Sequence, residues 1–123
     1  MSTLTKQDLR NKIDELNQMI LQGEILEAFD KFYSRDIVME EEGEKREGWE
    51  ANREYEEQFV NGLTEFRGAD VLAVGVDEEN QKTLVEWYFD FTLEGVGDLE
   101  FKQVAIQTWD NGKIVNEKFY KLG

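Results

Sequence analysis

The feature that most constrains the fold of this chain is a set of three β-rich runs in its last third. The runs cover 84–93, 98–109 and 113–120 and are joined by short turns. The second turn contains Asn111 and Gly112, and an Asn-Gly pair between β-rich runs is the strongest short hairpin signal, because both central residues of such a turn take positive φ. The sequence therefore predicts an antiparallel meander whose side chains alternate between two faces.

Helical spacing of apolar residues dominates the first half of the chain. Thr5 is expected to cap a first helix that carries Leu9 and Ile13 on one apolar stripe and ends at Gly23. The further elements expected are a second helix over 24–33, a short strand over 36–40, a polar loop over 41–48, a third helix over 49–62 and a long strand over 64–77. Helices followed by long antiparallel strands predict an α+β fold in which the helices pack on one face of the sheet.

Composition limits the chemistry that is open to the chain. Its 123 residues are 40% hydrophobic, which predicts a single domain over 1–123. The sequence contains no His and no Cys, so any acid–base chemistry must use carboxylates, Lys or Tyr. The acidic run 40–44 lacks the spaced Asp and Asn pattern of a calcium loop and is expected to be a solvated edge. We expect no metal and no cofactor.

Charge and hydropathy indicate where the chain works. It has 28 acidic and 14 basic residues and a net charge of -14, which repels phosphate backbones, so neither nucleic acid nor an anionic membrane is expected as a partner. No apolar run approaches the length of a membrane span, and the first residues lack the apolar stretch of a secretory signal. These patterns predict a cytoplasmic protein.

The two turns set a register that assigns each side chain to a face. Across the turn at 94–97 the expected register places Glu86 opposite Ile106, and across the second turn Ile106 lies opposite Glu117. One face, here the carboxylate face, then carries Leu84, Glu86, Tyr88, Asp90, Thr92, Lys102, Val104, Ile106, Thr108, Val115, Glu117 and Phe119. The other, here the aromatic face, carries Val85, Trp87, Phe89, Phe91, Phe101, Gln103, Ala105, Gln107, Trp109, Ile114, Asn116, Lys118 and Tyr120. Both faces carry large apolar residues, and the helices can cover only one of them.

The plan of the chain is marked by Gly23 at the end of the first helix, Phe-Tyr-Ser-Arg-Asp at 32–36, Gly48 before the third helix and the closing Trp-Asp-Asn-Gly-Lys-Ile-Val hairpin at 109–115. This plan resembles the SnoaL-like branch of the nuclear transport factor 2-like superfamily. The resemblance spans about residues 6 to 121. It implies a cone-shaped α+β fold in which a curved antiparallel sheet wraps a small-molecule pocket, and frequent dimerisation through the convex face of the sheet.

The resemblance also implies which face lines the pocket. It places Phe119, and with it the carboxylate face, where members of the superfamily carry pocket residues. The aromatic face then becomes the expected surface of a homodimer, through Trp87, Phe89, Gln103, Ala105, Gln107 and Trp109.

The isomerase chemistry of the superfamily is not supported by the matching residues. Glu41 stands at the place of the isomerase base, but Leu16 and Val104 stand at the places of its oxyanion hole, and neither side chain donates a hydrogen bond.

Two further chemistries of the superfamily also lack their residues. Dehydratase and cyclase chemistry in this superfamily uses a His, which this chain does not contain. The Asp-Arg-Asp set of limonene epoxide hydrolase is matched by Glu86, Tyr88 and Phe119, so its Arg and its last acid are missing.

Three functions stay open for the predicted pocket. The first is a small-molecule-binding homodimer, the second a carboxylate-based lyase, isomerase or hydrolase acting on a small hydrophobic substrate, and the third a protein-interaction module that uses the aromatic face. The candidate catalytic residues are Glu86, Glu117 and Glu41. The candidate ligand-binding residues are Tyr33, Tyr55, Phe59, Tyr88, Val104, Ile106 and Phe119. The structural alternative is that Glu86 and Glu117 pair with Arg10 or Arg53 and that the tyrosines pack in the core.

Overall fold

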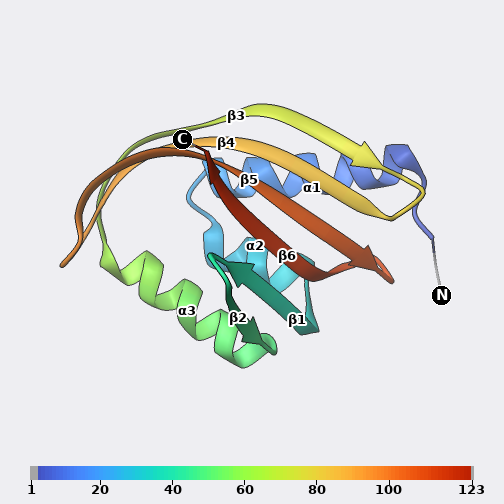
Figure 1. Cartoon of the computed structure of the whole chain (residues 1–123), viewed down its shortest axis with the longest axis horizontal. Helices are drawn as coiled ribbons and strands as arrows, with labels where there is room; N and C mark the ends of the chain where they lie inside the picture. Colours follow the sequence, from blue (N-terminus) through green and yellow to red (C-terminus); the bar gives the residue numbers. More distant parts are fainter. Residues whose placement is uncertain (1–2, 123) are drawn as a thin grey trace.

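The computed structural model describes residues 3–122, which form three helices and a six-stranded sheet (Figure 1). The predicted domain 1–123 thus includes three residues, 1, 2 and 123, that lie outside the described part. The elements are α1 (Lys6–Leu21), α2 (Ile25–Phe32), β1 (Tyr33–Glu41), β2 (Glu44–Glu47), α3 (Trp49–Gly62), β3 (Leu63–Asp77), β4 (Lys82–Leu93), β5 (Gly97–Asp110) and β6 (Lys113–Leu122).

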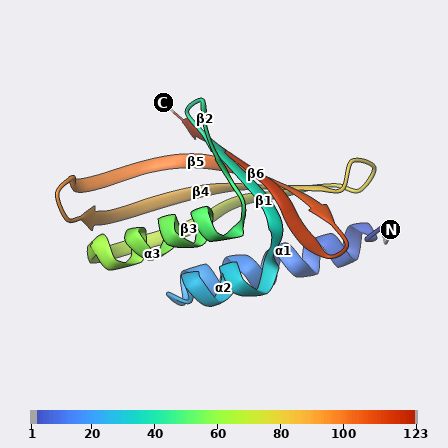
Figure 2. The same cartoon turned by 90° about the horizontal axis from the view of Figure 1, so that it is seen from below.

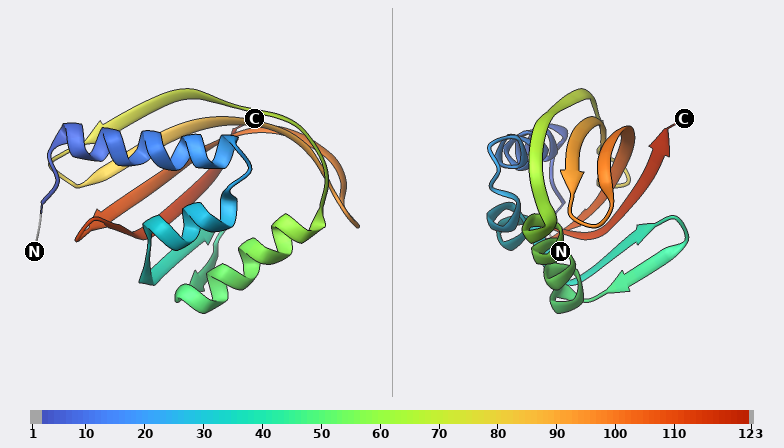
Figure 3. Two further views of the ribbon diagram at one scale, coloured as in Figure 1. Left: turned by 180° about the vertical axis from the view of Figure 1, so that it is seen from behind. Right: turned by 90° about the vertical axis from the view of Figure 1, so that its left-hand side faces the viewer.

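The sheet is open and strongly curved. Its strand order is β2-β1-β6-β5-β4-β3, and every neighbouring pair is antiparallel except β1 and β6, which run parallel. Figures 1 and 3 show β3, β4 and β5 arching over α1, and Figure 2 shows the helices together on one side of the sheet. The predicted α+β cone is confirmed.

The helices form where local signals placed them. Thr5 caps α1 through a capping box with Asp8, in which each side chain accepts a hydrogen bond from the other residue's backbone N–H. The buried stripe of α1 includes Leu9 and Ile13, and α2 buries Phe29 and other apolar residues. These stripes pack on β4, β5 and β6 through the core residues Val85, Trp87, Ala105, Trp109 and Ile114.

The hairpin between β4 and β5 keeps the predicted faces with a different register. Its loop is the three residues 94–96, and Leu93 pairs with Gly97, so Glu86 lies opposite Val104 rather than Ile106. The register differs from the expected one by two residues. An even shift leaves every side chain on its predicted face, because the side-chain period of a strand is two.

The hairpin between β5 and β6 contains a bulge that exchanges the faces of β6. Asn111 and Gly112 have φ of 52° and 77°, as the turn requires. Trp109 pairs with Ile114, but Thr108 pairs with Asn116, so Val115 is an extra residue on β6. The side chains of all later residues of β6 therefore point to the face opposite to the predicted one.

As a result, β6 presents different residues to each face than predicted. Glu117 lies opposite Gln107, and Phe119 lies opposite Ala105. Both side chains therefore join the aromatic face rather than Val104 and Ile106.

The expected assignment of the concave and convex faces is wrong. Glu86, Tyr88, Val104 and Ile106 lie on the outward face, and the aromatic face is concave and covered by the helices. The physical reason is the bulge at Val115, which carries Phe119 to the other face. The residues expected at the dimer surface, Trp87, Phe89, Gln103, Ala105, Gln107 and Trp109, instead lie in the core or line an internal cavity.

The segment 41–48, expected as a loop, is also partly ordered as a strand. Its residues close a hairpin in which β2 pairs with the end of β1. Among residues 3–122, none of the helices combines the length and the apolar content needed to cross a bilayer.

Candidate functional site

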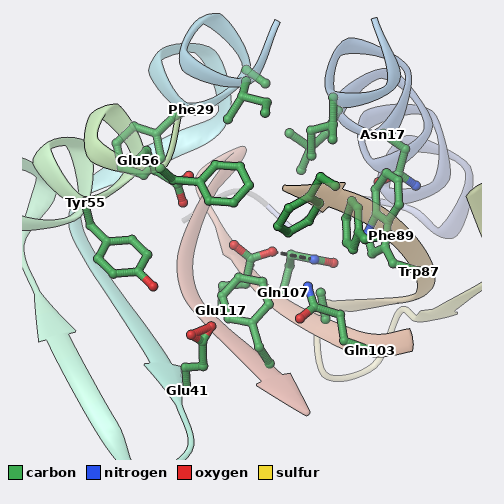
Figure 4. Close-up of a pocket in the computed structure, with 18 of the residues that line it drawn as sticks. Asn17, Phe29, Glu41, Tyr55, Glu56, Trp87, Phe89, Gln103, Gln107 and Glu117 are labelled. Atoms are coloured by element: carbon green, nitrogen blue, oxygen red, sulfur yellow. Dashed lines mark hydrogen bonds between the residues drawn. The ribbon is translucent and has the colours of Figure 1, made fainter. Parts of the chain in front are cut away.

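A cavity of about 270 Å³ lies between the helices and the concave face of the sheet (Figure 4). Its walls are mainly apolar and include nine aromatic residues: Phe29, Tyr33, Tyr55, Phe59, Trp87, Phe89, Phe91, Phe101 and Phe119. Several of these rings pack on one another, with Trp87 stacked on Phe89 at 5.0 Å between centroids. The cavity is thus a partly open apolar pocket into which a few polar groups project.

Glu117 is the most enclosed acidic group of the cavity. Its side chain comes from β6 just after the bulge, and the residue is only 4% exposed. The hydroxyl of Tyr33 donates to Oε1 at 2.5 Å, and Nε2 of Gln107 donates to Oε2 at 2.7 Å. Each carboxylate oxygen therefore has one protein donor, which fixes the orientation of the group.

A second layer of hydrogen bonds orients Gln107. The hydroxyl of Thr83 donates to Oε1 of Gln107 at 2.6 Å, and Nε1 of Trp109 donates to the Thr83 oxygen at 3.0 Å. Because the Thr83 proton is directed at Oε1, the amide nitrogen of Gln107 must face Glu117. All three side chains are buried, so this series of hydrogen bonds orients the carboxylate of Glu117 without help from solvent.

Burial shifts the pKa values of the groups around Glu117. Burial raises the pKa of Glu117, while the hydrogen bonds from Gln107 and Tyr33 act in the opposite direction. Burial and the adjacent Glu117 charge hold the pKa of Tyr33 well above its usual value. Tyr33 therefore stays protonated and serves as a donor.

Glu56, from α3, is a second acidic group of the cavity and was not predicted. Burial, followed by repulsion from Glu117, raises its pKa from 4.5 to about 7, and the charge of Arg46 opposes this shift. Glu56 shares a helix face with buried Asn52 and cavity-lining Phe59, at positions i, i+4 and i+7. That spacing was the sequence signal that could have identified it.

Arg46 brings a positive charge to the rim of the cavity. It lies on β2, in the segment expected to be a loop, and its guanidinium sits 3.6 Å from the centroid of the Tyr55 ring. Its Nε also donates to Oδ1 of Asn52 at 3.3 Å. The charged residues that line the cavity are Glu41, Glu56, Glu117, Arg46 and Lys121. Within residues 3–122, no three acidic side chains are grouped so as to hold a metal ion.

The structure brings together only part of the predicted site. Around the cavity lie Glu41, Glu117, Tyr33, Tyr55, Phe59 and Phe119. On the outward face lie Glu86, Tyr88, Val104 and Ile106, because β4 and β5 direct their other side chains into the cone. Sequence reasoning missed Asn17, Arg46 and Glu56 and placed Gln103 and Gln107 on the outside. The functional roles of the cavity residues stay predictions.

The observed fold agrees with the family that the sequence matches. Residues 4–121 match the model of the SnoaL-like domain. Since the match covers almost the entire sequence, the chain belongs to the SnoaL-like domain family, within the nuclear transport factor 2-like superfamily. A comparison with curated proteins found no match.

Solved structures show the same architecture. A candidate SnoaL-like polyketide cyclase from Mesorhizobium loti superposes with a TM-score of 0.80 at 25% identity, covering 91% of this chain and 97% of that one. An M. tuberculosis epoxide hydrolase that is similar to limonene epoxide hydrolase has a TM-score of 0.75 at 16% identity, with 95% and 84% covered. A nuclear transport factor 2-like protein of unknown function from Burkholderia xenovorans LB400 has a TM-score of 0.73 at 18% identity, with 94% and 83% covered. The last two likenesses concern the fold alone.

Proposed function

We propose that this chain binds a compact, largely apolar ring compound inside the cone. The observation that carries the proposal is an aromatic cavity of about 270 Å³ with the buried, oriented carboxylate of Glu117 in its wall. Ligand pockets are typically apolar enclosures of about 300–1,000 Å³ with a few placed polar groups. The volume of about 270 Å³ lies just below that range and favours a bicyclic compound over a larger one.

The polar groups of the cavity favour a ligand with a hydrogen-bond donor or a positive charge. Three of the charged residues lining it, Glu41, Glu56 and Glu117, are acidic, against the basic Arg46 and Lys121. Each oxygen of Glu117 accepts one hydrogen bond from the protein and keeps a lone pair for another donor. Aromatic faces add attraction for a cation.

Two bicyclic compounds that differ in one group test this proposal. Isothermal titration calorimetry should show binding of 2-aminotetralin and weaker binding of tetralin, which lacks the amine. Glu117→Gln should weaken binding of the amine about tenfold, the effect expected for a charge-assisted hydrogen bond, and leave tetralin unaffected. The control is Glu86→Gln, which changes a carboxyl group on the outward face.

The outcomes separate the parts of the proposal. If neither compound binds, the cavity is not a site for small apolar molecules. If Glu117→Gln and Glu86→Gln behave alike, the carboxylate of Glu117 does not contact the amine.

A second candidate function is acid–base catalysis by the same carboxyl groups. It is favoured by the pKa of Glu56 of about 7, since a carboxyl group that exchanges a proton near neutral pH lies in the same cavity as the carboxyl group of Glu117. This pairing suits a lyase, isomerase or hydrolase acting on a small hydrophobic substrate.

Hydrogen exchange tests this second function. In D₂O, NMR should show that the protein accelerates exchange of the acidic C1 hydrogens of 2-tetralone, with Glu117 accepting the proton. Glu117→Gln should abolish the acceleration while Glu86→Gln retains it. Exchange at the uncatalysed rate with wild-type protein would count against catalysis of this kind.

We also propose that the chain forms a homodimer, through the outward face of the sheet. This face carries the half-buried Tyr88, Val104 and Ile106, with exposed Tyr120 opposite Val104. Ile106 lies between Leu84 on β4 and Lys118 on β6, and Glu86 lies opposite Val104 on the same face. The face thus combines apolar, acidic and basic side chains, which favours a self-complementary contact about a two-fold axis.

A further inference from the structure

Gln103 has a side-chain amide that makes no hydrogen bond to any other group of residues 3–122. It lies on β5, is half-buried and lines the cavity. Both amide atoms keep accessible surface, because Nδ2 of Asn17 is the only enclosed side-chain nitrogen or oxygen without a partner in the described residues. Gln107, on the same strand and face, uses both of its amide atoms in hydrogen bonds to other side chains. On the β5 wall of the cavity, the amide of Gln103 is therefore the one that another molecule can reach.

The neighbours of Gln103 leave its amide free to turn. It pairs with Trp87 on β4 and with Lys121 on β6, whose Nζ lies over the ring of Phe101 at 5.0 Å from the centroid. Figure 4 shows the amide directed into the cavity, with the rings of Trp87 and Phe89 at one side. Aromatic rings are only weak acceptors for an amide N–H. Since no hydrogen bond fixes the amide, it can present both its N–H and its C=O to a bound molecule.

A bound molecule that shuts water away from this amide must offer it an acceptor and a donor. An amide atom that loses its water without a new partner weakens binding. A carboxylic acid and a lactam both carry an acceptor and a donor side by side, the lactam because its ring holds N–H and C=O on one side. A carboxylic acid ionises near neutral pH, and its charge is disfavoured because Glu41, Glu56 and Glu117 outnumber Arg46 and Lys121 on the cavity wall. A lactam stays neutral.

We propose that Gln103 forms a subsite for the amide edge of a lactam ring in the bound compound. Nε2 of Gln103 donates to the lactam oxygen, and the lactam N–H donates to Oε1, so that the two amides lie edge to edge. The proposal rests on the proposed function and refines it by naming the chemical class of the ligand. The remainder of the ring system packs against the aromatic wall, and any separate donating or cationic group points to Glu117.

Binding of a bicyclic lactam and of a hydrocarbon of the same shape tests the subsite. Calorimetry with the full chain should show that wild-type protein binds 3,4-dihydroquinolin-2-one about thirtyfold more tightly than tetralin, as expected for two neutral hydrogen bonds. The N-methyl lactam has no N–H and should lose most of this preference. Gln103→Met has nearly the same length and no amide, so it should bind the lactam no more tightly than tetralin. Gln58→Met, at an exposed position of α3, should keep the preference.

A second measurement reads the hydrogen bond directly in wild-type protein. The side-chain ¹H–¹⁵N signals of Gln103, identified by their absence from the spectrum of Gln103→Met, should move downfield with the lactam and less with tetralin. Gln103→Leu provides a second variant without the amide. Tetralin affinity at the wild-type level shows that a variant has kept its folded cavity.

The outcomes distinguish this inference from the proposed function. If wild-type protein binds tetralin and the lactam equally, or if Gln103→Met keeps the lactam preference, the Gln103 subsite is disproved while ligand binding stands. Gln103 signals that move equally with both compounds also disprove it. If neither compound binds wild-type protein, both the subsite and the proposed function fall.

Discussion

At the scale of single residues, Glu117 and Glu56 are two carboxyl groups with different surroundings. Glu117 accepts hydrogen bonds from Tyr33 and Gln107, which favour its charged form and oppose the effect of burial. For Glu56, burial and the charge of Glu117 together raise the pKa to about 7. With a pKa of about 7, Glu56 is therefore a group of the cavity that gains and loses a proton near neutral pH.

Glu56→Gln should make the protein more stable than wild type at pH 8 and have little effect at pH 5. The folded-state pKa of Glu56, about 7, is above its ordinary value of 4.5, so the folded state binds a proton that the unfolded state releases. The associated stability is present below pH 4.5 and is lost as the pH rises through 7. Thermal melting of both proteins across this range measures the effect.

Glu54→Gln is the matched control for Glu56, because Glu54 is an exposed residue of the same helix. It should follow the wild-type melting temperature at both pH values. The same behaviour from Glu56→Gln would show that the pKa of Glu56 is ordinary.

Tyr33→Phe should lower the free energy of unfolding by about 1–3 kcal/mol, because it removes a donor from the buried carboxylate of Glu117. The variant keeps the ring of residue 33 stacked on Phe29, whose centroid lies 4.7 Å from that of Tyr33. Urea denaturation measures the change. Tyr120→Phe, at a residue that is 52% exposed, should change the free energy by less than about 0.5 kcal/mol. Equal effects of the two variants would contradict the role given to the Tyr33 hydroxyl.

At the scale of elements, Asn52 ties the start of α3 to the hairpin of β1 and β2. Its amide donates to the carbonyls of Arg46 on β2 and Gly48 before α3, and it accepts a hydrogen bond from Nε of Arg46. Because Arg46 and Glu56 line the cavity from β2 and α3, this link holds one side of the site together.

Asn52→Ala should therefore cost about 2–4 kcal/mol of stability, since it removes a fully buried side chain that donates to the backbone carbonyls of Arg46 and Gly48 and accepts from Nε of Arg46. Chemical denaturation should show a lower midpoint with an unchanged slope. Asn61→Ala, at an exposed position of the same helix, serves as the control. A loss no larger than that of the control would mean that Asn52 does not connect these elements.

At the scale of the whole molecule, the outward face of the sheet is the surface proposed for the homodimer, because the helices cover the concave face. Its central residues are Tyr88, Val104 and Ile106, which are half-buried in the protomer. A contact about a two-fold axis would cover these side chains on both copies at once.

Sedimentation equilibrium should give a mass about twice the 14.4 kDa of the chain, and Ile106→Lys should reduce it to that of the monomer. The added Lys places like charges on the two facing surfaces, which opposes association. Val96→Lys, in the turn before β5 at a residue that is 67% exposed, should leave the dimer intact. A monomeric wild type would refute the dimer, and a dimeric Ile106→Lys would move the interface to another surface.

The sequence by itself determined the α+β class, the helices, the meander and the alternation of side chains along each strand. These depend on local signals, such as the Thr5 cap and the Asn111-Gly112 turn, which act over a few residues. The sequence also indicated six residues that line the cavity, although Glu117 and Phe119 lie on the other face of the sheet than expected: Glu41, Glu117, Tyr33, Tyr55, Phe59 and Phe119.

Only the tertiary structure decided which face of the sheet became the cavity wall. One extra residue, Val115, reverses the side chains of β6, and no local pattern separates a bulged pairing from a regular one. Glu56 and Gln107 were likewise hidden from sequence reasoning, because their role comes from burial against elements distant in the chain. The position of a bulge and the burial of a side chain both depend on which surfaces pack together, and this packing is determined by the whole fold.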